Sequence, residues 1–96
     1  MKPSTALLSH RIALRELAAR HRLGSPRVFG SVIHGTDRDD SDLDVLVEPT
    51  EQTTLFTLTR FAQEAEVLTG VRVDVVTPGS LPADIRDQVT LEAQAI

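Results

Sequence analysis

Three short aliphatic segments alternate along the chain with longer segments of helical periodicity. Glycine or proline closely follows each aliphatic segment, so each of them predicts a β-strand. Strands that alternate with helices indicate an α/β (α+β) fold with one small three-stranded sheet and helices packed on it. The first connection between strands is short for a parallel crossover, so we expect a mixed sheet. The predicted strands are 27–29, 43–48 and 71–76, and the predicted helices are 4–22, 32–37, 53–69 and a last one from residue 80.

Single residues predict the ends and the inner face of these helices. Ser4 and Ser80 are placed to cap the first and the last helix. Gly24 and Gly70 are expected to end the helices predicted at 4–22 and 53–69. The core-facing stripe of the helix predicted at 53–69 consists of Leu55, Leu58, Ala62 and Ala65.

Composition limits the classes of protein to which the chain can belong. Its 96 residues suit one domain, spanning 1–96, and 41% apolar with 25% charged residues is typical of a globular protein. A net charge of −4 argues against strong nucleic-acid binding, which usually needs a basic face. The absence of cysteine excludes disulfides and thiolate chemistry. Since the sequence has neither an apolar run of about 20 residues nor a signal-peptide pattern, we expect no membrane association and a cytoplasmic location.

Two aspartates stand at the start of the second predicted strand. Successive side chains on a strand point to opposite faces, so Asp42 and Asp44 are expected to share one face, with carboxylates roughly 6–7 Å apart. Two carboxylates at a strand end lower stability unless a positive charge compensates them, and only Arg38 lies within the acidic run. A shared divalent cation is the simplest compensation.

The rest of the acidic run allows simpler explanations. Asp37, Asp39 and Asp40 suit the turns of a solvated loop. Residues 40–51 also carry acids at the spacing of an EF-hand calcium loop. That loop requires glycine at its sixth position, where this chain has Val45 within a predicted strand, so a calcium loop is disfavoured.

A third carboxylate interrupts the last predicted strand. Asp74 is the only acid in 71–76, and burying an uncompensated charge is costly. An ion pair with Arg72 or another arginine would explain it. If the second and third strands are neighbours, Asp74 can instead join Asp42 and Asp44 as a third ligand. Three carboxylates without histidine or cysteine select a hard ion, Mg²⁺ or Mn²⁺, which typically bridges carboxylates to the phosphates of a substrate.

A Gly-Ser pair follows the first predicted strand. Gly30 would let the backbone approach a ligand closely. Ser31 offers a hydroxyl and an N–H group at a helix start, where phosphates bind. A plain turn could have the same two residues, and the pair fits neither the P-loop nor the dinucleotide-binding motif.

The Gly-Ser pair and the aspartates form one spaced pattern. Gly30-Ser31 is followed after ten residues by Asp42-Leu43-Asp44, and later by Asp74. This pattern resembles the polymerase-β-like nucleotidyltransferase superfamily, in particular its minimal nucleotidyltransferase branch. The resemblance implies that Asp42, Asp44 and Asp74 bind Mg²⁺ or Mn²⁺ and act in catalysis, with Asp74 completing the metal site or deprotonating the acceptor. It also implies that Gly30, Ser31 and Ser41 contact the nucleotide.

The resemblance further implies a reaction and a partner. A hydroxyl attacks the α-phosphate of ATP, AMP is transferred and pyrophosphate leaves. Members of this branch are often encoded beside a helical HEPN ribonuclease toxin, and the implied acceptor is a tyrosine of that toxin, with which a hetero-oligomer can form. The chain would then be the antitoxin. The alternative is a non-catalytic antitoxin that neutralises its partner by binding alone.

One segment departs from the pattern of that family. Relatives commonly carry arginine between the two glycines, whereas this chain has Val32, Ile33 and His34. One or two phosphate-binding cations are therefore absent, and His34 could replace one of them. The departure bears on nucleotide binding or rate more than on the metal site, and it motivates the non-catalytic alternative.

Overall fold

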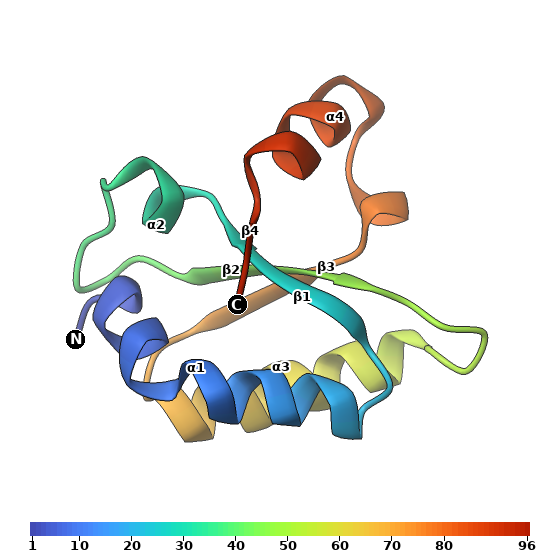
Figure 1. Cartoon of the computed structure of the whole chain (residues 1–96), viewed down its shortest axis with the longest axis horizontal. Coiled ribbons are helices and arrows are strands. Elements are labelled where there is room, and N and C mark those ends of the chain that lie inside the picture. Colours follow the sequence, from blue (N-terminus) through green and yellow to red (C-terminus); the bar gives the residue numbers. More distant parts are fainter.

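A computed structural model, which describes residues 1–96, places a four-stranded sheet between two long helices on one side and shorter helical elements on the other (Figure 1). None of the helices combines the length and the apolarity that crossing a membrane requires. In chain order the elements are α1 (Pro3–Arg20), β1 (Gly24–Phe29), α2 (Ser31–His34), β2 (Leu43–Glu48), α3 (Leu55–Thr69), β3 (Val73–Val76), the 3₁₀ turn η1 (Pro78–Ser80), α4 (Ala83–Glu92) and β4 (Gln94–Ala95).

The sheet has the strand order β3-β2-β1-β4. β1 runs antiparallel to β2 and to β4, whereas β2 and β3 are parallel. The predicted α/β class and mixed sheet are therefore confirmed. The sheet has four strands rather than the predicted three, because Gln94 and Ala95 pair with Val28 and Arg27. A strand of two residues is too short to show a period in the sequence.

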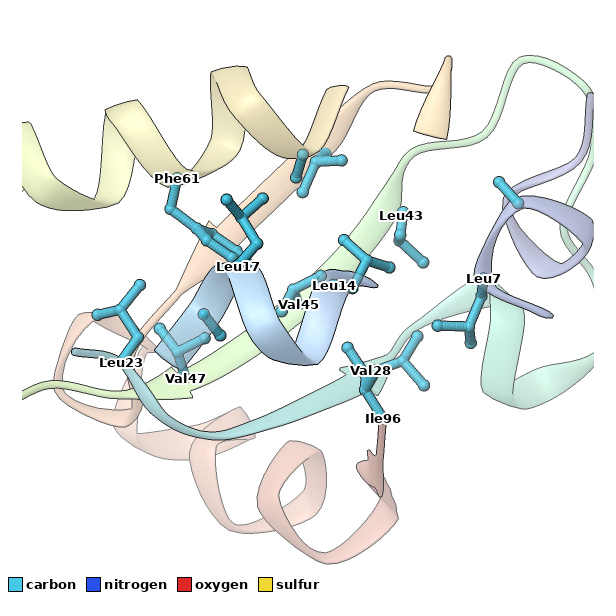
Figure 2. Close-up of a cluster of buried hydrophobic side chains, with 14 of the residues drawn as sticks. Leu7, Leu14, Leu17, Leu23, Val28, Leu43, Val45, Val47, Phe61 and Ile96 are labelled. Carbon is cyan, nitrogen blue, oxygen red and sulfur yellow. The ribbon is translucent and has the colours of Figure 1, made fainter. Parts of the chain in front are cut away.

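The core lies between the sheet and the two long helices, α1 and α3 (Figure 2). Leu43, Val45 and Val47 alternate along β2 and are fully buried on this side of the sheet. Leu14 from α1 and Phe61 from α3 belong to the same cluster. Since the chain has three phenylalanines and no tryptophan or tyrosine, aliphatic side chains supply most of this core.

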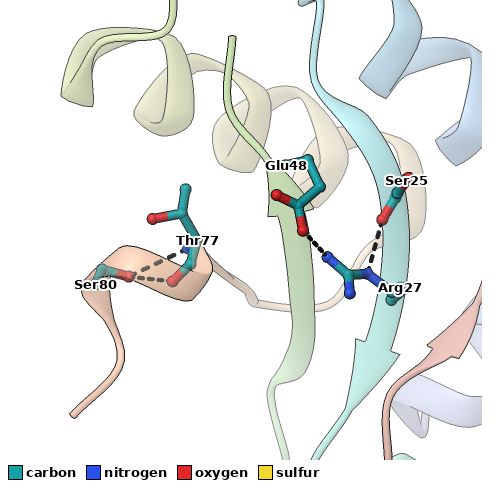
Figure 3. A network of polar contacts seen from close by, with 5 residues as sticks. All are labelled: Ser25, Arg27, Glu48, Thr77 and Ser80. Carbon is teal, nitrogen blue, oxygen red and sulfur yellow. Dashed lines mark hydrogen bonds and ion pairs between the residues drawn. The ribbon is translucent and has the colours of Figure 1, made fainter. Parts of the chain in front are cut away.

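The opposite face of β2 carries Asp44, Leu46 and Glu48, because side chains alternate along a strand. Leu46 is fully buried, and η1 packs against β2 on this side. At the far end of the face, Arg27 Nη2 donates to Glu48 Oε1 at 2.7 Å. Figure 3 shows this ion pair and the hydrogen bonds that close η1. The face is therefore covered at one end and carries Asp44 at the other.

A long-range hydrogen bond holds the start of α1. Ser4 does not cap this helix as predicted, because the helix begins one residue earlier, at Pro3. The N–H group of Ser4 instead donates to Asp37 Oδ2 at 2.8 Å. This N–H group holds the pKa of the Asp37 carboxyl below its usual value. Asp37, predicted to lie in a solvated loop, therefore supplies an acceptor to the first turn of a helix.

The other helix ends confirm one prediction and correct two, and one residue of the predicted core-facing stripe is also corrected. Gly70 ends α3 in the left-handed conformation, as predicted for the end of this helix. Gly24 is the first residue of β1 and ends no helix. Ser80 belongs to η1, and α4 begins only after Pro82. Leu55 is 80% exposed and does not face the core, because the buried residues of α3 all lie in its later turns.

Candidate active site

The structure confirms that the second and third predicted strands are neighbours. β2 and β3 are parallel, and their register places Asp44 opposite Asp74. Registered side chains of parallel strands project from the same face, which here is the face away from α1 and α3. Asp42 lies just before β2, and its charge is close enough to help raise the pKa of Asp44. The fold therefore brings the three predicted acids near one another at one end of the sheet.

Gly30 lies against the carboxylate of Asp44. It follows β1, whose last residue, Phe29, pairs with Asp44 across the antiparallel strands. The φ angle of Gly30 is +75°, which disfavours residues with a Cβ atom. A Cβ atom at this position would also overlap Asp44 Oδ2. Glycine is thus required at this position for two reasons: the positive φ angle, and the carboxylate that occupies the space of a Cβ atom.

Asp44 is the electrostatically perturbed member of the site. Burial, together with the like charges of Asp74 and Asp42, raises the pKa of Asp44 from 3.8 to about 6. No ion pair involves Asp44 or Asp74. A carboxyl group perturbed by burial and by neighbouring acids is typical of functional sites. The site therefore has excess negative charge that a bound cation would neutralise.

Arg72 pairs with Asp42 and not with Asp74. Its Nε atom lies 3.0 Å from Asp42 Oδ1, and its Nη2 atom donates to the carbonyl oxygen of Asp40 at 3.3 Å. Asp42 Oδ1 is buried and accepts no hydrogen bond, so the contact with Arg72 is an ion pair without hydrogen-bond geometry. The explanation of Asp74 as an ion-pair partner of Arg72 is therefore wrong. Sequence alternation placed Arg72 near Asp74, whereas the structure pairs its guanidinium with Asp42.

The chemistry of these residues fits a hard divalent cation. Carboxylate oxygens are the ligands that Mg²⁺ and Mn²⁺ prefer. The buried Asp42 Oδ1 has an unused acceptor position. No group of three acidic or histidine side chains is already arranged to hold a metal ion. The Asp42 carboxylate already has a positive partner, the guanidinium of Arg72.

The two serines predicted to contact a nucleotide follow Gly30 and precede Asp42 in the chain. Ser31 is the first residue of α2, a helix of four residues that follows Gly30. Ser41 Oγ accepts a hydrogen bond from the N–H group of Arg38 at 2.9 Å, which closes the turn before β2. Both serines are partly exposed. Ser31 is open to a ligand, whereas Ser41 already has a local structural role.

The segment that lacks arginine makes contacts of its own. Val32 and Ile33 pack against the core. His34 Nε2 lies 2.9 Å from Glu92 Oε2 in α4, and hydrogen bonds from Gln88 and His34 lower the pKa of Glu92. Gly30 and His34 line a cavity of about 280 Å³ whose other wall is α4. No local pattern predicts that α4 borders the site, because His34 and Glu92 are 58 residues apart.

Comparison with known proteins identifies the family. The family model described as polymerase beta, nucleotidyltransferase, matches residues 14–96, which include the Gly-Ser pair and all three aspartates. The chain belongs to this nucleotidyltransferase family. The predicted superfamily and the predicted enzyme class, a nucleotidyltransferase, are therefore confirmed.

Individual relatives agree with this assignment. The protein adenylyltransferase MntA of Thermococcus cleftensis is 36% identical over 86 residues, which are 90% of this chain and 84% of that protein. A solved structure assigned as a minimal nucleotidyltransferase is 44% identical, with a TM-score of 0.84 over 100% of this chain and 95% of that one. A crystal structure of the toxin–antitoxin MntA–HpeT, 22% identical with a TM-score of 0.73, covers 90% of this chain and 70% of that one. This last structure shares the fold.

Proposed function

We propose that this nucleotidyltransferase transfers AMP from ATP to a hydroxyl group of a partner protein, with Mg²⁺ as the required ion and Mn²⁺ as a substitute. The observation that carries the proposal is the registered pair of Asp44 and Asp74, with the Asp44 carboxylate packed directly against Gly30. Carboxylates gathered in this way suit a hard cation that also binds phosphate oxygens. The relative MntA is a protein adenylyltransferase, which supports AMP as the transferred group and a protein as the acceptor.

Each residue of the site has a role in the proposed reaction. Asp42, Asp44 and Asp74 would hold the cation, which would neutralise charge on the phosphate oxygens and align the attacking and leaving groups. Gly30-Ser31 lies against the triphosphate, where a free N–H group and a hydroxyl can donate to phosphate oxygens. Ser41, which directly precedes Asp42, donates its hydroxyl to the nucleotide. Positioning and charge stabilisation then provide most of the rate enhancement.

The bond changes of this reaction are those of an in-line displacement. The hydroxyl oxygen of the acceptor forms a bond to the α-phosphorus, and the bond between that phosphorus and the bridging oxygen breaks, so that pyrophosphate leaves. Asp74 is the most exposed of the three acids, and its carboxylate takes the proton of the attacking hydroxyl. Asp44 must be ionised to bind a cation, and its pKa of about 6 permits this at neutral pH.

We propose a HEPN ribonuclease toxin as the partner and a tyrosine of that toxin as the acceptor, which makes this chain the antitoxin. The resemblance to the minimal nucleotidyltransferase branch supports this partner, and the fold shared with the MntA–HpeT antitoxin is consistent with it. In this arrangement the partner brings the acceptor hydroxyl to the exposed acidic end of the sheet. The modified toxin loses its ribonuclease activity.

The test is transfer of label from ATP labelled at the α-phosphate to the protein encoded by the adjacent gene, in the presence of Mg²⁺. Wild type should label a tyrosine, located by mass spectrometry, and Asp42→Asn and Asp44→Asn should lose the transfer. Glu48→Gln is the matched control, because Glu48 lies on the same face of β2 at its other end. Absence of label on the partner, or equal labelling by the Asp44→Asn variant, would refute the enzymatic proposal.

One observation favours the non-catalytic alternative. Between the two glycines, Val32 and Ile33 pack against the core, and this segment has no arginine that could bind a triphosphate. If the chain neutralises its partner by binding alone, the Asp42→Asn/Asp44→Asn double variant should protect cells from the toxin as well as wild type does. Loss of protection by this folded double variant would reject the alternative.

A further inference from the structure

We propose that Arg72 is an internal counter-cation, which occupies Asp42 when no metal ion is bound and must leave Asp42 before a metal ion can bind there. Arg72 thereby sets the metal affinity of the site. This inference rests on the metal-dependent function proposed above and extends it to a residue outside the pattern of three aspartates. Arg72 is therefore assigned as a competitor of the metal ion that acts through Asp42 and takes no part in the chemical step.

The position of Arg72 is fixed by the same strand pairing that assembles the site. The N–H group of Leu43 donates to the carbonyl oxygen of Arg72 at 2.8 Å, immediately before the paired residues of β2 and β3. From this point the guanidinium reaches back to Asp42, 3.0 Å from Nε to Oδ1, and to the carbonyl oxygen of Asp40, 3.3 Å from Nη2. Arg72 therefore links the end of the acidic loop to the edge of the sheet.

The contact between Arg72 and Asp42 leaves part of the carboxylate unsatisfied. Asp42 Oδ1 is buried and accepts no hydrogen bond, although Nε of Arg72 lies 3.0 Å away. A buried acceptor without a hydrogen bond is unfavourable, and direct coordination of a hard cation would satisfy it. The guanidinium thus supplies charge at Asp42 without the bond that this oxygen requires.

The side chain of Arg72 can leave Asp42 although its backbone is held by strand pairing. Its side chain is 75% exposed, and ion pairs of exposed side chains contribute little to stability. It is the only basic side chain that forms an ion pair with any of the three acids. Exchange of Arg72 for a divalent ion therefore replaces a weakly held single positive charge with a double positive charge at the same carboxylate.

The test is Mn²⁺ binding to the nucleotide-free full chain, measured by electron paramagnetic resonance of the free ion. Arg72→Met should bind Mn²⁺ about two- to fivefold more tightly than wild type, because no ion pair has to be broken first. Arg72→Lys keeps the positive charge and should stay within about twofold of wild type. Arg38→Met is the matched control: it removes a positive charge from the adjacent loop, where the Arg38 side chain makes no ion pair or hydrogen bond, and should bind like wild type.

A second measurement follows Arg72 itself. In the ¹⁵N-labelled chain, the Nε–Hε signal of Arg72 should shift and exchange faster with water as Mg²⁺ is added, and it should not respond to Mg²⁺ in Asp42→Asn. The amide spectrum of each variant verifies that it is folded.

The outcomes separate this inference from the proposed function. If Arg72→Met binds Mn²⁺ as tightly as wild type or more weakly, Arg72 is not a competitor of the metal ion, and the inference is wrong while the metal site stands. Weaker binding would mean that Arg72 instead holds Asp42 in place for the ion. If neither wild type nor Arg72→Met binds Mn²⁺, the proposed metal site is wrong and the inference falls with it.

Discussion

Asp44 and Asp74 occupy registered positions on neighbouring parallel strands and face the same side of the sheet. Neither carboxylate has a basic partner, because Arg72 pairs with Asp42. A like-charge pair at this position opposes folding unless a cation is bound. This arrangement is typical of a site where the requirements of function oppose stability.

Removal of the Asp44 charge should stabilise the metal-free protein. The pKa of Asp44 lies at about 6 in the folded chain, above its ordinary value of 3.8, so the folded state holds this proton more tightly than the unfolded state does. The resulting stabilisation is fully present below pH 3.8 and is lost as the pH rises through about 6. At pH 8 with EDTA, Asp44→Asn should unfold at a higher urea concentration than wild type. We expect its unfolding free energy to be higher by about 1 kcal/mol after allowance for solvent screening.

Urea unfolding at two pH values isolates the contribution of Asp44. The difference in unfolding free energy between Asp44→Asn and wild type should be clearly smaller at pH 4.5, where Asp44 is neutral in the folded chain, and should approach zero only below pH 3.8, where Asp44 is neutral in the unfolded chain as well. An advantage of Asp44→Asn that is the same at pH 4.5 and pH 8 would contradict the raised pKa. In transfer assays the same variant should be inactive.

A side chain at Gly30 should disable the site. In Gly30→Ala the Cβ atom overlaps Asp44 Oδ2, and the φ angle of +75° adds strain. We expect AMP transfer to fall by about 100-fold or more, since small displacements of catalytic groups have effects of this size. Transfer kinetics and urea unfolding of the same variant measure the two effects.

Gly70→Ala separates the overlap from the backbone strain. Gly70 has a φ angle of +77°, but nothing lies within 4 Å of the added Cβ atom. This variant should lose about 1–2 kcal/mol of unfolding free energy and keep its transfer rate. Equal transfer rates for Gly30→Ala and Gly70→Ala would show that the approach of Gly30 to Asp44 is unimportant.

Loss of Asp37 should weaken the start of α1. Asp37 Oδ2 accepts the N–H group of Ser4, so Asp37→Ala leaves this group without its acceptor and should cost about 1 kcal/mol of unfolding free energy at pH 7. The pKa of Asp37 is lowered in the folded state, so the contribution is present above the ordinary value of 3.8 and disappears as the pH falls through the lower folded pKa. Urea unfolding measures it, with Asp39→Ala as the control, because Asp39 is exposed and has only a 3.9 Å contact with the N-terminal amine. Equal losses in the two variants would contradict the capping role.

The single buried aromatic ring should dominate the stability of the core. Phe61 is 1% exposed between α3 and the sheet, and Phe61→Ala should cost about 3–5 kcal/mol of unfolding free energy. Phe56 lies on the same helix and is 71% exposed, so Phe56→Ala is the matched control and should change the unfolding free energy by less than about 0.5 kcal/mol. Thermal unfolding followed by circular dichroism compares the two. A large loss for Phe56→Ala would place that ring in an interface of the folded protein.

The sequence predicted the parts of this protein that depend on local patterns. Alternation in 43–48 separates Asp44 from the core residues Val45 and Val47, and the structure has these faces as predicted. The β-branched segment around Asp74 predicted a strand, and the spacing from Gly30 to Asp74 identified the family. Helix caps were predicted less well. Ser4 and Ser80 resemble capping residues, but Ser4 lies inside the first turn of α1 and Ser80 inside η1.

The tertiary structure alone decided which charges meet. The sequence left Asp74 with either Arg72 or the other acids as neighbours, and strand register resolved this by placing Asp74 opposite Asp44 while Arg72 turned to Asp42. The contact of Asp37 with Ser4 joins residues 33 positions apart and has no local signature. A period along the chain determines which face a side chain occupies, whereas the partner across that face depends on the pairing of distant segments, which packing of the whole core sets.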